Sequence, residues 1–511
     1  MNAAVLTIAR RLRRTLQTTL QSQSQFSTSA RRYNPRKPER RLQSIIFPVA
    51  SPSANLVPEI ERWIEKGNTV QPYDLQLVIK GLRRLRRFRQ ALEVSEWMKT
   101  KSNLPFRPGD HAVQLDLIGV VHGMSSAEDY FNKLPQEHKT EKAYGALLNC
   151  YVRERQVDKA LAHMNKMKQL GLAYAPLPYN NIMNLYAATG QHEKVYSVLS
   201  QMKEDGVFPD NLSYRICIVS CGARSDVSGM KKLLQEMEQQ PQIVMDWNTY
   251  TAVANVYLNS GFPTWAVLAL EKAEKKMNKS DSVAYNHLIS LYARLCDKRQ
   301  VQRLWELQKN NCKRPINRDY LIMLSALVKL DDIKEAEVLL KQWYSSLNIL
   351  DFRVPNILFR AYQTSGQLEK AEALLDQFVK EGKKPHSNSW GIVAAGYAAQ
   401  GEMDKAHAMM KNALCVYMPN LGWTPNHKLV NEILYYLGEN GDLKDVETFI
   451  ELLKVARPMD SDMYYPLIKA RIRAGKEVND LLKGMKDDGV KESEDIKEVL
   501  SSAEKRVIGR S

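Results

Sequence analysis

Cationic side chains are concentrated in one short stretch of the chain. Between residues 80 and 89 stand Lys80, Arg83, Arg84, Arg86, Arg87 and Arg89. Several guanidinium groups near the end of one helix would neutralise the charged backbone of a nucleic acid, so we predict phosphate contacts from the four arginines between positions 83 and 87. The alternative is a solvated polar face of the kind that ends an array of helices.

The sequence lacks the common patterns of catalytic residues. It has no glycine-rich phosphate loop, no His-Glu-x-x-His motif, and no Cys-x-x-Cys with a nearby His-x-Glu. Glu335, Glu337, Glu369 and Glu372 recur at helical spacing, as solvated charges do. We therefore predict that the protein is not an enzyme and has no catalytic residue, metal, cofactor or small-molecule substrate.

Six cysteines are scattered through the chain without a clustered framework: Cys150, Cys217, Cys221, Cys296, Cys312 and Cys415. This distribution predicts buried thiols in a reducing compartment. Cys217 and Cys221 stand four residues apart and could share a metal, but no pair of histidines lies beside them at a ligand spacing. We favour simple packing of small side chains.

Helical periodicity indicates which elements carry these residues. From Tyr179 onward, apolar residues recur three and four positions apart and stop at Thr189-Gly190. A second apolar run, from Val195 to Met202, stops at Gly206. The pattern predicts two short helices joined by a bend. Because a helix of about 12 residues does not bury its apolar face alone, such a hairpin requires stacked neighbours.

The hairpin pattern repeats at a nearly constant interval. Its first aromatic position advances by 35 residues, once by 36, through Tyr144, Tyr179, Tyr214, Tyr250, Tyr285, Tyr320, Pro355 and Trp390. The small residue of the second helix keeps the same register, as Ala160, Val195, Met230, Ala266, Val301, Ala336, Ala371 and Ala406. A bulky side chain there would separate the two helices. We predict an all-α solenoid of about twelve 35-residue helical hairpins, not several globular domains.

The repeats divide the chain into segments. Residues 71–490 form the solenoid, with a five-residue insertion before the eleventh hairpin. Residues 32–70 form a proline-containing connector with a short lead-in helix, and residues 491–511 form a charged tail expected to be a solvated cap. No apolar run approaches the ~20 residues needed to cross a bilayer, so we expect no membrane insertion.

The first 31 residues have the composition of a transit peptide. No acidic residue precedes Glu39, whereas eight arginines and lysines stand before it among many Ser, Thr and Gln. The arginines come early and at helical spacing, so we favour the mitochondrial matrix over the chloroplast. A disordered basic arm for nucleic acid is the alternative. These cations supply half of the formal net charge of +16, so net charge alone supports nucleic-acid binding only weakly.

The repeated pattern resembles the pentatricopeptide repeat. The shared features are Tyr-Asn near the start, Gly after the first helix, Ala in the second, Met then Gly, and Pro-Asp at the close. The all-35-residue spacing is similar to the P class of plant organelles, and no zinc deaminase domain follows. The resemblance covers about residues 75–490. It implies a right-handed α-solenoid whose groove, lined by first helices, binds single-stranded RNA with one base per repeat.

In that family two positions choose the base, namely the residue after the Tyr and the residue after the closing Pro. Asn180 with Asp210 resembles the pair that prefers uracil, and Thr251 with Asp281 resembles the pair that prefers guanine. We predict that these four residues contact bases. The other units depart from the pattern: Gly145 with Ala175, Arg215 with Met245, Asn286 with Ile316, Leu321 with Asp351, Asn356 with His386, and Gly391 with Asn426. Gly, Ala, Leu and Ile side chains form no hydrogen bond with a base.

Cations also recur next to the hairpin bend. The equivalent residues are Arg84, Arg153, Arg294, Lys329 and Arg473. In the family such a cation can face the RNA backbone, so we predict phosphate contacts from Arg153, Arg294 and Lys329. They could instead be favourable charges at helix carboxyl ends.

Two functions of different class follow from the resemblance. The first is a free RNA-binding factor in mitochondrial RNA metabolism or translation. The second is a structural component of the plant-type mitochondrial ribosome, with ribosomal RNA and mitochondrial ribosomal proteins as partners. Most predicted base-contacting pairs depart from the family pattern, which favours the second function more than it would for a sequence-reading protein. A scaffold that binds only proteins is a further alternative. The sequence does not identify the RNA, the oligomeric state or the transit-peptide cleavage site.

Overall fold

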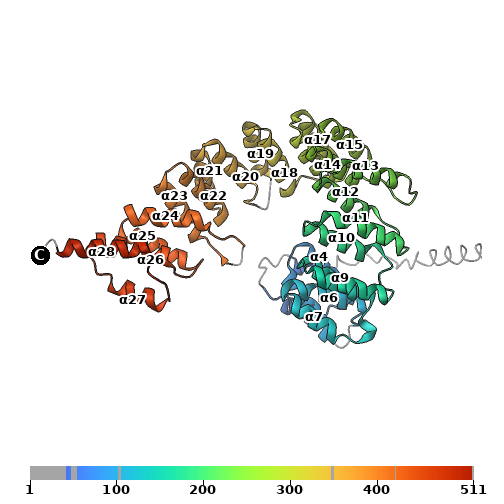
Figure 1. The fold of residues 1–511 in the computed structure, drawn as a ribbon, viewed down its shortest axis with the longest axis horizontal. Helices are drawn as coiled ribbons and strands as arrows, with labels where there is room; N and C mark the ends of the chain where they lie inside the picture. Colours follow the sequence, from blue (N-terminus) through green and yellow to red (C-terminus); the bar gives the residue numbers. More distant parts are fainter. Residues whose placement is uncertain (1–41, 48–53, 102–104, 347–349, 420–421, 509–511) are drawn as a thin grey trace, which may run out of the picture. The chain divides into compact units, whose positions relative to one another are not determined.

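The computed structural model describes residues 42–47, 54–101, 105–346, 350–419 and 422–508. Every regular element in these ranges is a helix, which confirms the all-α prediction. The predicted transit peptide, residues 1–31, lies outside the described residues. Figure 1 labels the helices along the chain. The structure divides into two compact units. The first comprises residues 1–190 and 201–208, and the second comprises residues 191–200 and 209–511.

The first unit begins with two short helices and continues as hairpins. Its helices are α2 (Leu42–Ile46), α3 (Val57–Glu65), α4 (Pro72–Arg84), α5 (Phe88–Thr100), α6 (Pro108–Val121), α7 (Met124–Lys133), the 3-10 helix η1 (Gln136–His138), α8 (Glu141–Arg153), α9 (Val157–Gln169) and α10 (Pro176–Ala188). The unit boundary falls within α11 (His192–Glu204). Helix α2 packs on α4 and α3 packs on α5, so the lead-in segment covers the first hairpin.

The second unit continues the hairpins to the carboxyl end. Its helices are α12 (Asn211–Ala223), α13 (Val227–Glu238), α14 (Trp247–Asn259), α15 (Pro263–Lys276), α16 (Ser282–Arg294), α17 (Lys298–Asn311), α18 (Asn317–Lys329), α19 (Ile333–Ser346), α20 (Pro355–Ser365), α21 (Leu368–Lys380), α22 (Ser387–Ala399), α23 (Met403–Cys415), α24 (His427–Asn440), α25 (Leu443–Lys454), α26 (Ser461–Arg473), α27 (Asn479–Asp487) and α28 (Glu494–Ile508). The helices from α4 to α27 pair into twelve hairpins, as predicted.

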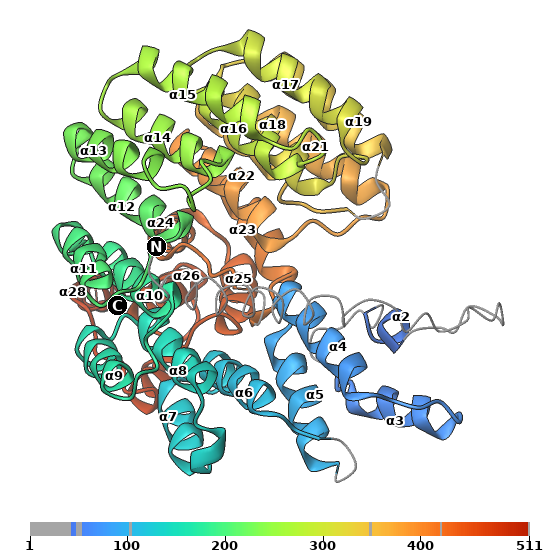
Figure 2. The ribbon, with the colours of Figure 1, turned by 90° about the vertical axis from the view of Figure 1, so that its right-hand side faces the viewer.

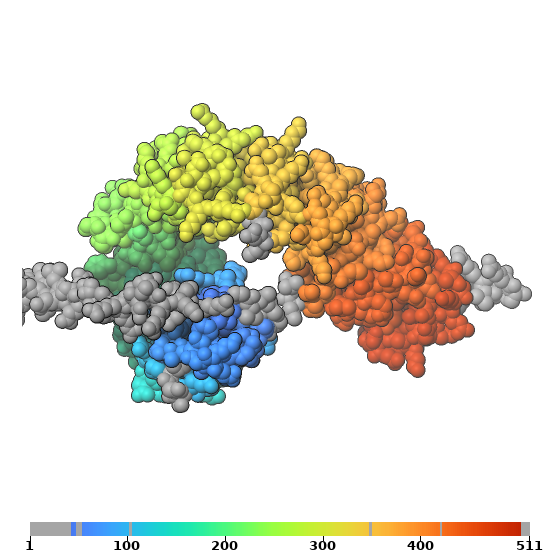
Figure 3. All heavy atoms as spheres, turned by 180° about the vertical axis from the view of Figure 1, so that it is seen from behind, coloured from blue at the N-terminus to red at the C-terminus, as the bar shows by residue number. Residues whose placement is uncertain are grey.

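Helices of the second unit lie in two layers. The first helices of successive hairpins, α12, α14, α16 and α18, pack side by side, and α13, α15, α17 and α19 form the other layer (Figure 2). Figure 3 shows the tight packing of the carboxyl-terminal hairpins, in orange and red. Most first helices span 13 residues, which is too short for independent stability, so this lateral packing provides the core.

The two sequence columns form that core. Tyr179, Tyr214 and Tyr285 are at most 1% exposed, and every member of the small-residue column is fully buried. The Tyr179 hydroxyl donates a hydrogen bond to Asp205 Oδ2 at 2.6 Å, and the Tyr214 hydroxyl donates to Glu236 Oε1 at 2.6 Å. Each bond fixes the start of a first helix to the end of the second. The predicted hairpin packing is therefore confirmed.

The bend inside each hairpin requires a left-handed backbone. Gly190 has a φ of 76°, as predicted for a residue that ends the first helix. Five hairpins place a side chain at the equivalent bend, at Arg86, Arg155, Ser225, Cys296 and Asp331, with φ between 55° and 58°. A left-handed residue with a Cβ costs about 1 kcal/mol or more. These bends are therefore local points of strain.

The charged tail is a packed helix rather than a solvated cap. Ile496 of α28 is fully buried in a cluster with Tyr464, Ile468 and Met485 of the last hairpin. The charged side chains that the structure describes in this helix, Glu494, Asp495, Lys497 and Glu498, are exposed, which is why composition alone suggested a solvated segment. Helix α28 thus covers the apolar end of the array.

Candidate nucleic-acid interface

Within each unit, equivalent residues of the first helices share one helix face. Positions follow the 35-residue register, in which position 0 is four residues before the repeated aromatic position; this residue caps the first helix except in α20, where position 0 is Asp351 and the cap is Val354. The buried aromatic residue is then position 4, and positions 2, 5, 9 and 13 share one helix face because they lie three to four residues apart. We call this face the recognition stripe. The family's two base-contacting positions correspond to position 5 and to position 0 of the next hairpin.

Position 0 is held by the helix backbone. Asp210, Asp246 and Asp281 cap α12, α14 and α16. Asp210 Oδ1 accepts from the Ser213 backbone N–H at 2.8 Å, and Asp246 Oδ1 accepts from that of Thr249 at 2.8 Å. Because each carboxylate satisfies an otherwise unpaired amide, its place at the edge of the stripe is fixed by the fold.

The predicted pairing of Arg215 with Met245 is wrong by one residue. The loop between α13 and α14 carries one extra residue, so α14 begins later and its cap is Asp246. Arg215 Nη1 lies 3.3 Å from Asp246 Oδ2. The 36-residue step from Tyr214 to Tyr250 was the signal for this shift. Position 5 of this hairpin is therefore occupied by an internal ion pair.

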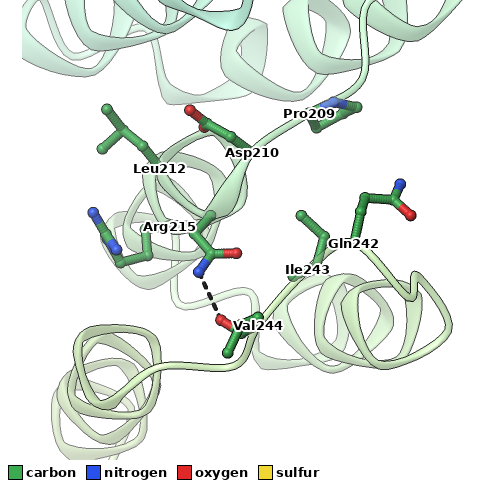
Figure 4. Close-up of a pocket in the computed structure, with 8 residues that line it drawn as sticks. Pro209, Asp210, Leu212, Arg215, Gln242, Ile243 and Val244 are labelled. Atoms are coloured by element: carbon green, nitrogen blue, oxygen red, sulfur yellow. Dashed lines mark hydrogen bonds between the residues drawn. The ribbon is translucent and has the colours of Figure 1, made fainter. Parts of the chain in front are cut away.

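The same loop borders an open pocket of about 520 Å³ (Figure 4). Its lining includes Leu212 and Arg215 of α12 and the loop residues Gln242, Ile243 and Val244. Asn211 Nδ2 donates to the Val244 carbonyl at 2.6 Å, which ties the loop to the start of α12. The pocket offers both an apolar surface and a cation on the recognition stripe.

The four predicted base-contacting residues take the expected register. Asn180 is at position 5 of α10, in the first unit, and is 1% exposed, whereas Asp210 belongs to the second unit. Thr251 is at position 5 of α14, and its hydroxyl donates to its own helix, to the Asn248 carbonyl at 2.9 Å. Asp281 caps α16 by accepting from the Val283 N–H at 2.9 Å. The Thr251 hydroxyl is therefore committed to the protein.

A further Asn and Asp pair was missed from the sequence. Asn431 is at position 5 of α24 and Asp460 caps α26, so they repeat the residue types of Asn180 and Asp210. Asp460 precedes Tyr464 by four residues, as Asp210 precedes Tyr214, and this was the available signal. However, Arg457 Nη2 donates to Asn431 Oδ1 at 3.1 Å and lies 3.5 Å from Asp460 Oδ2. Arg457 thus competes with any base.

Other position-5 residues are held by side chains of their own hairpin or of the neighbouring one. Asn286 Nδ2 donates to Asp319 Oδ1 at 2.7 Å, and Asn286 Oδ1 accepts from Gln308 Nε2 at 3.2 Å. Asn356 Oδ1 accepts from Ser389 Oγ at 2.7 Å. A Cβ on Gly391 would come within 3.0 Å of the Trp423 ring. These positions therefore serve packing between hairpins, in agreement with their departure from the family pattern.

Four of the predicted phosphate-contacting cations have protein partners. Arg83 Nη2 lies 2.6 Å from Asp116 Oδ2, and Arg153 Nη1 lies 3.1 Å from Asp116 Oδ1. Arg294 Nη2 donates to Asn259 Oδ1 at 2.6 Å. Arg87 Nη1 donates to the Phe47 carbonyl at 3.3 Å. Sequence spacing located these side chains but did not identify the partners on adjacent elements.

The remaining predicted cations, Arg84, Arg86 and Lys329, are exposed. Arg86 occupies one of the left-handed bends, with a φ of 57°. Exposed cations at the end of a first helix remain available to a polyanion. The set of cations that can contact RNA is therefore smaller than the sequence predicted.

Position 2 carries a set of side chains that the sequence analysis missed. Four first helices expose an apolar residue there, and the exposed fractions are 66% for Tyr73, 60% for Leu177, 37% for Leu212 and 37% for Val283. Four others expose a cation there, namely Lys142, Arg318, Arg353 and Lys428. Apolar surface suits the faces of bases, and cations suit phosphates. A search at the second residue after the cap would have found this column.

One group of side chains has the composition of a metal site. His427, Asp460 and Asp462 place one ligand atom each within 4.8 Å of the others. Asp460 also accepts from the Met463 N–H at 3.1 Å and lies near Arg457, whose charge opposes a cation. Asp462 accepts from Asn431. These contacts give the carboxylates a structural role that needs no metal. In the helices that the structure describes, no segment is long and apolar enough to span a membrane.

The fold and the stripe define a class of protein, an α-solenoid of helical hairpins with a polar and partly apolar face along its first helices. The sequence pattern of the PPR repeat matches residues 142–172, 319–345 and 354–382, and that of the PPR repeat family matches residues 178–223. A mitochondrial pentatricopeptide repeat-containing protein of Arabidopsis thaliana is 45% identical over 471 residues, which cover 92% of this chain and 96% of the relative. The chain therefore belongs to the pentatricopeptide repeat family.

Two other similarities extend this comparison. The large ribosomal subunit protein mL101 of Arabidopsis thaliana is 30% identical over 471 residues, covering 92% of this chain and 96% of that protein. The crystal structure of the pentatricopeptide repeat protein PPR10 from maize aligns with a TM-score of 0.34 and 16% identity, over 88% of this chain and 72% of that chain.

Proposed function

We propose that this chain is a mitochondrial RNA-binding protein that acts without catalysis in RNA metabolism or translation. Single-stranded RNA lies along the recognition stripe of the first helices. Its bases contact the apolar residues of position 2, and its phosphates contact exposed cations such as Arg84 and Lys329. The observation that carries the proposal is the position-2 column, because apolar side chains in one register are exposed to solvent at Tyr73 and Leu177 in the first unit and at Leu212 and Val283 in the second.

In this proposal, hydrogen bonds to the edges of bases contribute little to the choice of RNA sequence. Asn286 is held by Asp319 and Gln308, and Arg215 is paired with Asp246. A base contact at either site would have to replace an existing bond, which removes most of the ~1–3 kcal/mol that a bidentate contact gives in discrimination. Asn180 with Asp210 and Thr251 with Asp281 remain the pairs proposed to contact bases, and the Thr251 hydroxyl would have to exchange its bond to the Asn248 carbonyl to do so.

The relatives support a mitochondrial location and suggest a role in the mitochondrial ribosome. Several are named as mitochondrial, which agrees with the proposed transit peptide at residues 1–31. The similarity to mL101 along nearly the whole chain supports a second candidate, a structural component of the large mitochondrial ribosomal subunit. In that case the ligand is ribosomal RNA and the further partners are mitochondrial ribosomal proteins. Internally bonded position-5 residues suit a fixed RNA partner, since shape then replaces sequence reading.

Substitution at position 2 tests RNA binding. Changing Leu177, Leu212 and Val283 together to Ala should weaken binding of a single-stranded RNA by roughly 100-fold or slightly more. Each side chain is partly exposed, so its burial against a base contributes about 1 kcal/mol. A matched control is the change of Leu268, Val338 and Val379 to Ala, because these are similarly exposed at 46–48% on second helices. Equal affinity for both triple variants would refute the proposal.

Sedimentation separates the two roles. Mitochondrial lysate is run on a sucrose gradient with magnesium and again after chelation, and the protein is detected in each fraction. A ribosomal component should follow the large subunit when the subunits dissociate. Migration as a free protein or small complex in both gradients would exclude the ribosomal role and leave the free RNA-binding factor.

A further inference from the structure

Two tyrosines on neighbouring first helices form a stacked pair on the recognition stripe. Tyr435 is at position 9 of α24, and Tyr465 is at position 5 of α26. Their ring centroids are 5.9 Å apart and their planes differ by 5°. Tyr435 is 59% exposed. A large aromatic ring therefore lies on the stripe with one face against a second ring and much of its surface in solvent.

In this pair, the Tyr465 side chain is held in place by a network of polar contacts. The Tyr465 hydroxyl donates to Glu439 Oε1 at 2.8 Å, and Lys469 Nζ lies 3.1 Å from the Tyr465 oxygen. The Lys469 ammonium also contacts Glu439 and holds the pKa of that carboxyl below its usual range. Lys469 Nζ lies 5.4 Å from the Tyr465 ring centroid, within the range of a cation–π contact. The network immobilises Tyr465, so a ligand on the pair loses little additional freedom.

Tyr435 departs from the residues that occupy position 9 elsewhere. Five of the eleven other first helices hold a small polar side chain at this position, and none of the eleven holds an aromatic ring; the five are Asn149, Asn184, Asn255, Ser290 and Ser325. The preceding first helix, α22, has Ala395 at position 9 and Gly391 at position 5, so it supplies no large side chain of its own there. An exposed aromatic ring at a register that holds no other aromatic residue is unfavourable in water unless it has a ligand.

The same stripe of α24 supplies a cation. Lys428 at position 2 has a side chain that is 88% exposed and only a distant partner, Glu432, at 3.9 Å. It precedes Tyr435 by seven residues, or about 10 Å along the helix. A flexible lysine side chain reaches over part of that distance, so one nucleotide can place its base near Tyr435 and a phosphate near Lys428.

We propose that Tyr435, supported by Tyr465, is a stacking platform for one unpaired base of single-stranded RNA. The proposal rests on the proposed RNA binding and adds a site that does not use the two base-contacting positions. Stacking accepts all four bases because each has a flat aromatic face, and purines bind better because they cover more of the ring. Lys428 holds an adjacent phosphate. The platform anchors RNA at the carboxyl-terminal hairpins, where Arg457 occupies the base-contacting pair.

The test uses the full chain and single-stranded RNA that contains 2-aminopurine, whose fluorescence is quenched when it stacks. Tyr435→Ala should weaken binding about 5- to 50-fold, as loss of one stacked base does, and should abolish the protein-dependent quenching. Tyr435→Phe should bind within about twofold of the unchanged protein and retain quenching. Tyr196→Ala should change neither signal, because Tyr196 is a similarly exposed tyrosine, at 51%, on a second helix.

The outcomes separate this site from the proposed function. If the unchanged protein binds no RNA, RNA binding itself is refuted and the platform with it. If it binds RNA but Tyr435→Ala keeps affinity and quenching, the platform is refuted while RNA binding stands. If Tyr435→Phe fails as Tyr435→Ala does, the hydroxyl rather than the ring is required, and the stacking proposal is also overturned.

Discussion

The Asp116 carboxylate forms ion pairs with two of the predicted phosphate-contacting cations, Arg83 and Arg153. Asp116 Oδ2 lies 2.6 Å from Arg83 Nη2, and Asp116 Oδ1 lies 3.1 Å from Arg153 Nη1. Asp116 also accepts from Asn149 Nδ2 at 3.2 Å. Asp116→Asn keeps the shape of the side chain and removes its charge. We predict that the two guanidinium groups then turn to RNA phosphates.

The magnitude follows from the geometry of this cluster. The Arg83 and Arg153 side chains are 37% and 32% exposed, so loss of both ion pairs should destabilise the fold by only about 1 kcal/mol. Each new phosphate contact steepens the plot of log affinity against log salt by about 0.7 for a single strand. Two contacts should steepen it by about 1.4 and tighten binding up to about tenfold at low salt.

The assay is fluorescence anisotropy of a labelled single-stranded RNA between roughly 50 and 200 mM salt. Asp376→Asn is the matched control, because it changes the net charge equally at an exposed site on the second helix α21. A steeper slope for Asp116→Asn alone would support contact of Arg83 and Arg153 with RNA. Equal slopes for the two variants would show that these arginines lie outside the RNA path.

Three further predictions concern pH, backbone strain and register. Burial lowers the pKa of His111 to about 4. The unfolded imidazole, with a pKa near 6.5, binds a proton first, so stability should fall by up to ~3 kcal/mol as pH drops from about 6.5 to about 4. Denaturant unfolding should show a smaller loss for His111→Gln. Arg155→Gly relieves a left-handed bend with a φ of 55° and should raise the free energy of unfolding by about 0.5–1 kcal/mol, whereas Arg155→Ala should not. Arg215→Asn should create a base-contacting pair with Asp246 and tighten binding of RNA with uracil in that register by ~1–3 kcal/mol. A second change, Asp246→Ala, should cancel this gain, and Met245→Ala should not.

The fold was predictable because packing imposes the same residue types at each turn of the array. The aromatic residue of position 4 and the small residue of the second helix are both buried between helices, so their side chains are restricted in every hairpin. Two such columns with one period define the hairpin and its register. The period also identified the insertion before α24, although it could not show that α28 packs on the last hairpin.

The candidate site was less predictable because its side chains are exposed and their partners come from adjacent hairpins. Arg153 and Arg294 were located from spacing, yet their bonds to Asp116 and Asn259 depend on the lateral packing of first helices. The one-residue shift to Asp246 depends on where α14 begins, which the helix cap decides. The repeat pattern therefore predicts where a side chain lies on its helix. The structure shows which of these side chains are bonded to the adjacent helices.

The central claim is that single-stranded RNA lies along the first helices. Ultraviolet crosslinking of the full chain to 4-thiouridine RNA, followed by mass spectrometry of the crosslinked peptides, tests it most directly. We predict crosslinks in peptides that contain Leu177, Leu212 and Val283, and in the peptide of Tyr435. Crosslinks concentrated on second helices, in peptides with Leu268 or Val338, would contradict the claim.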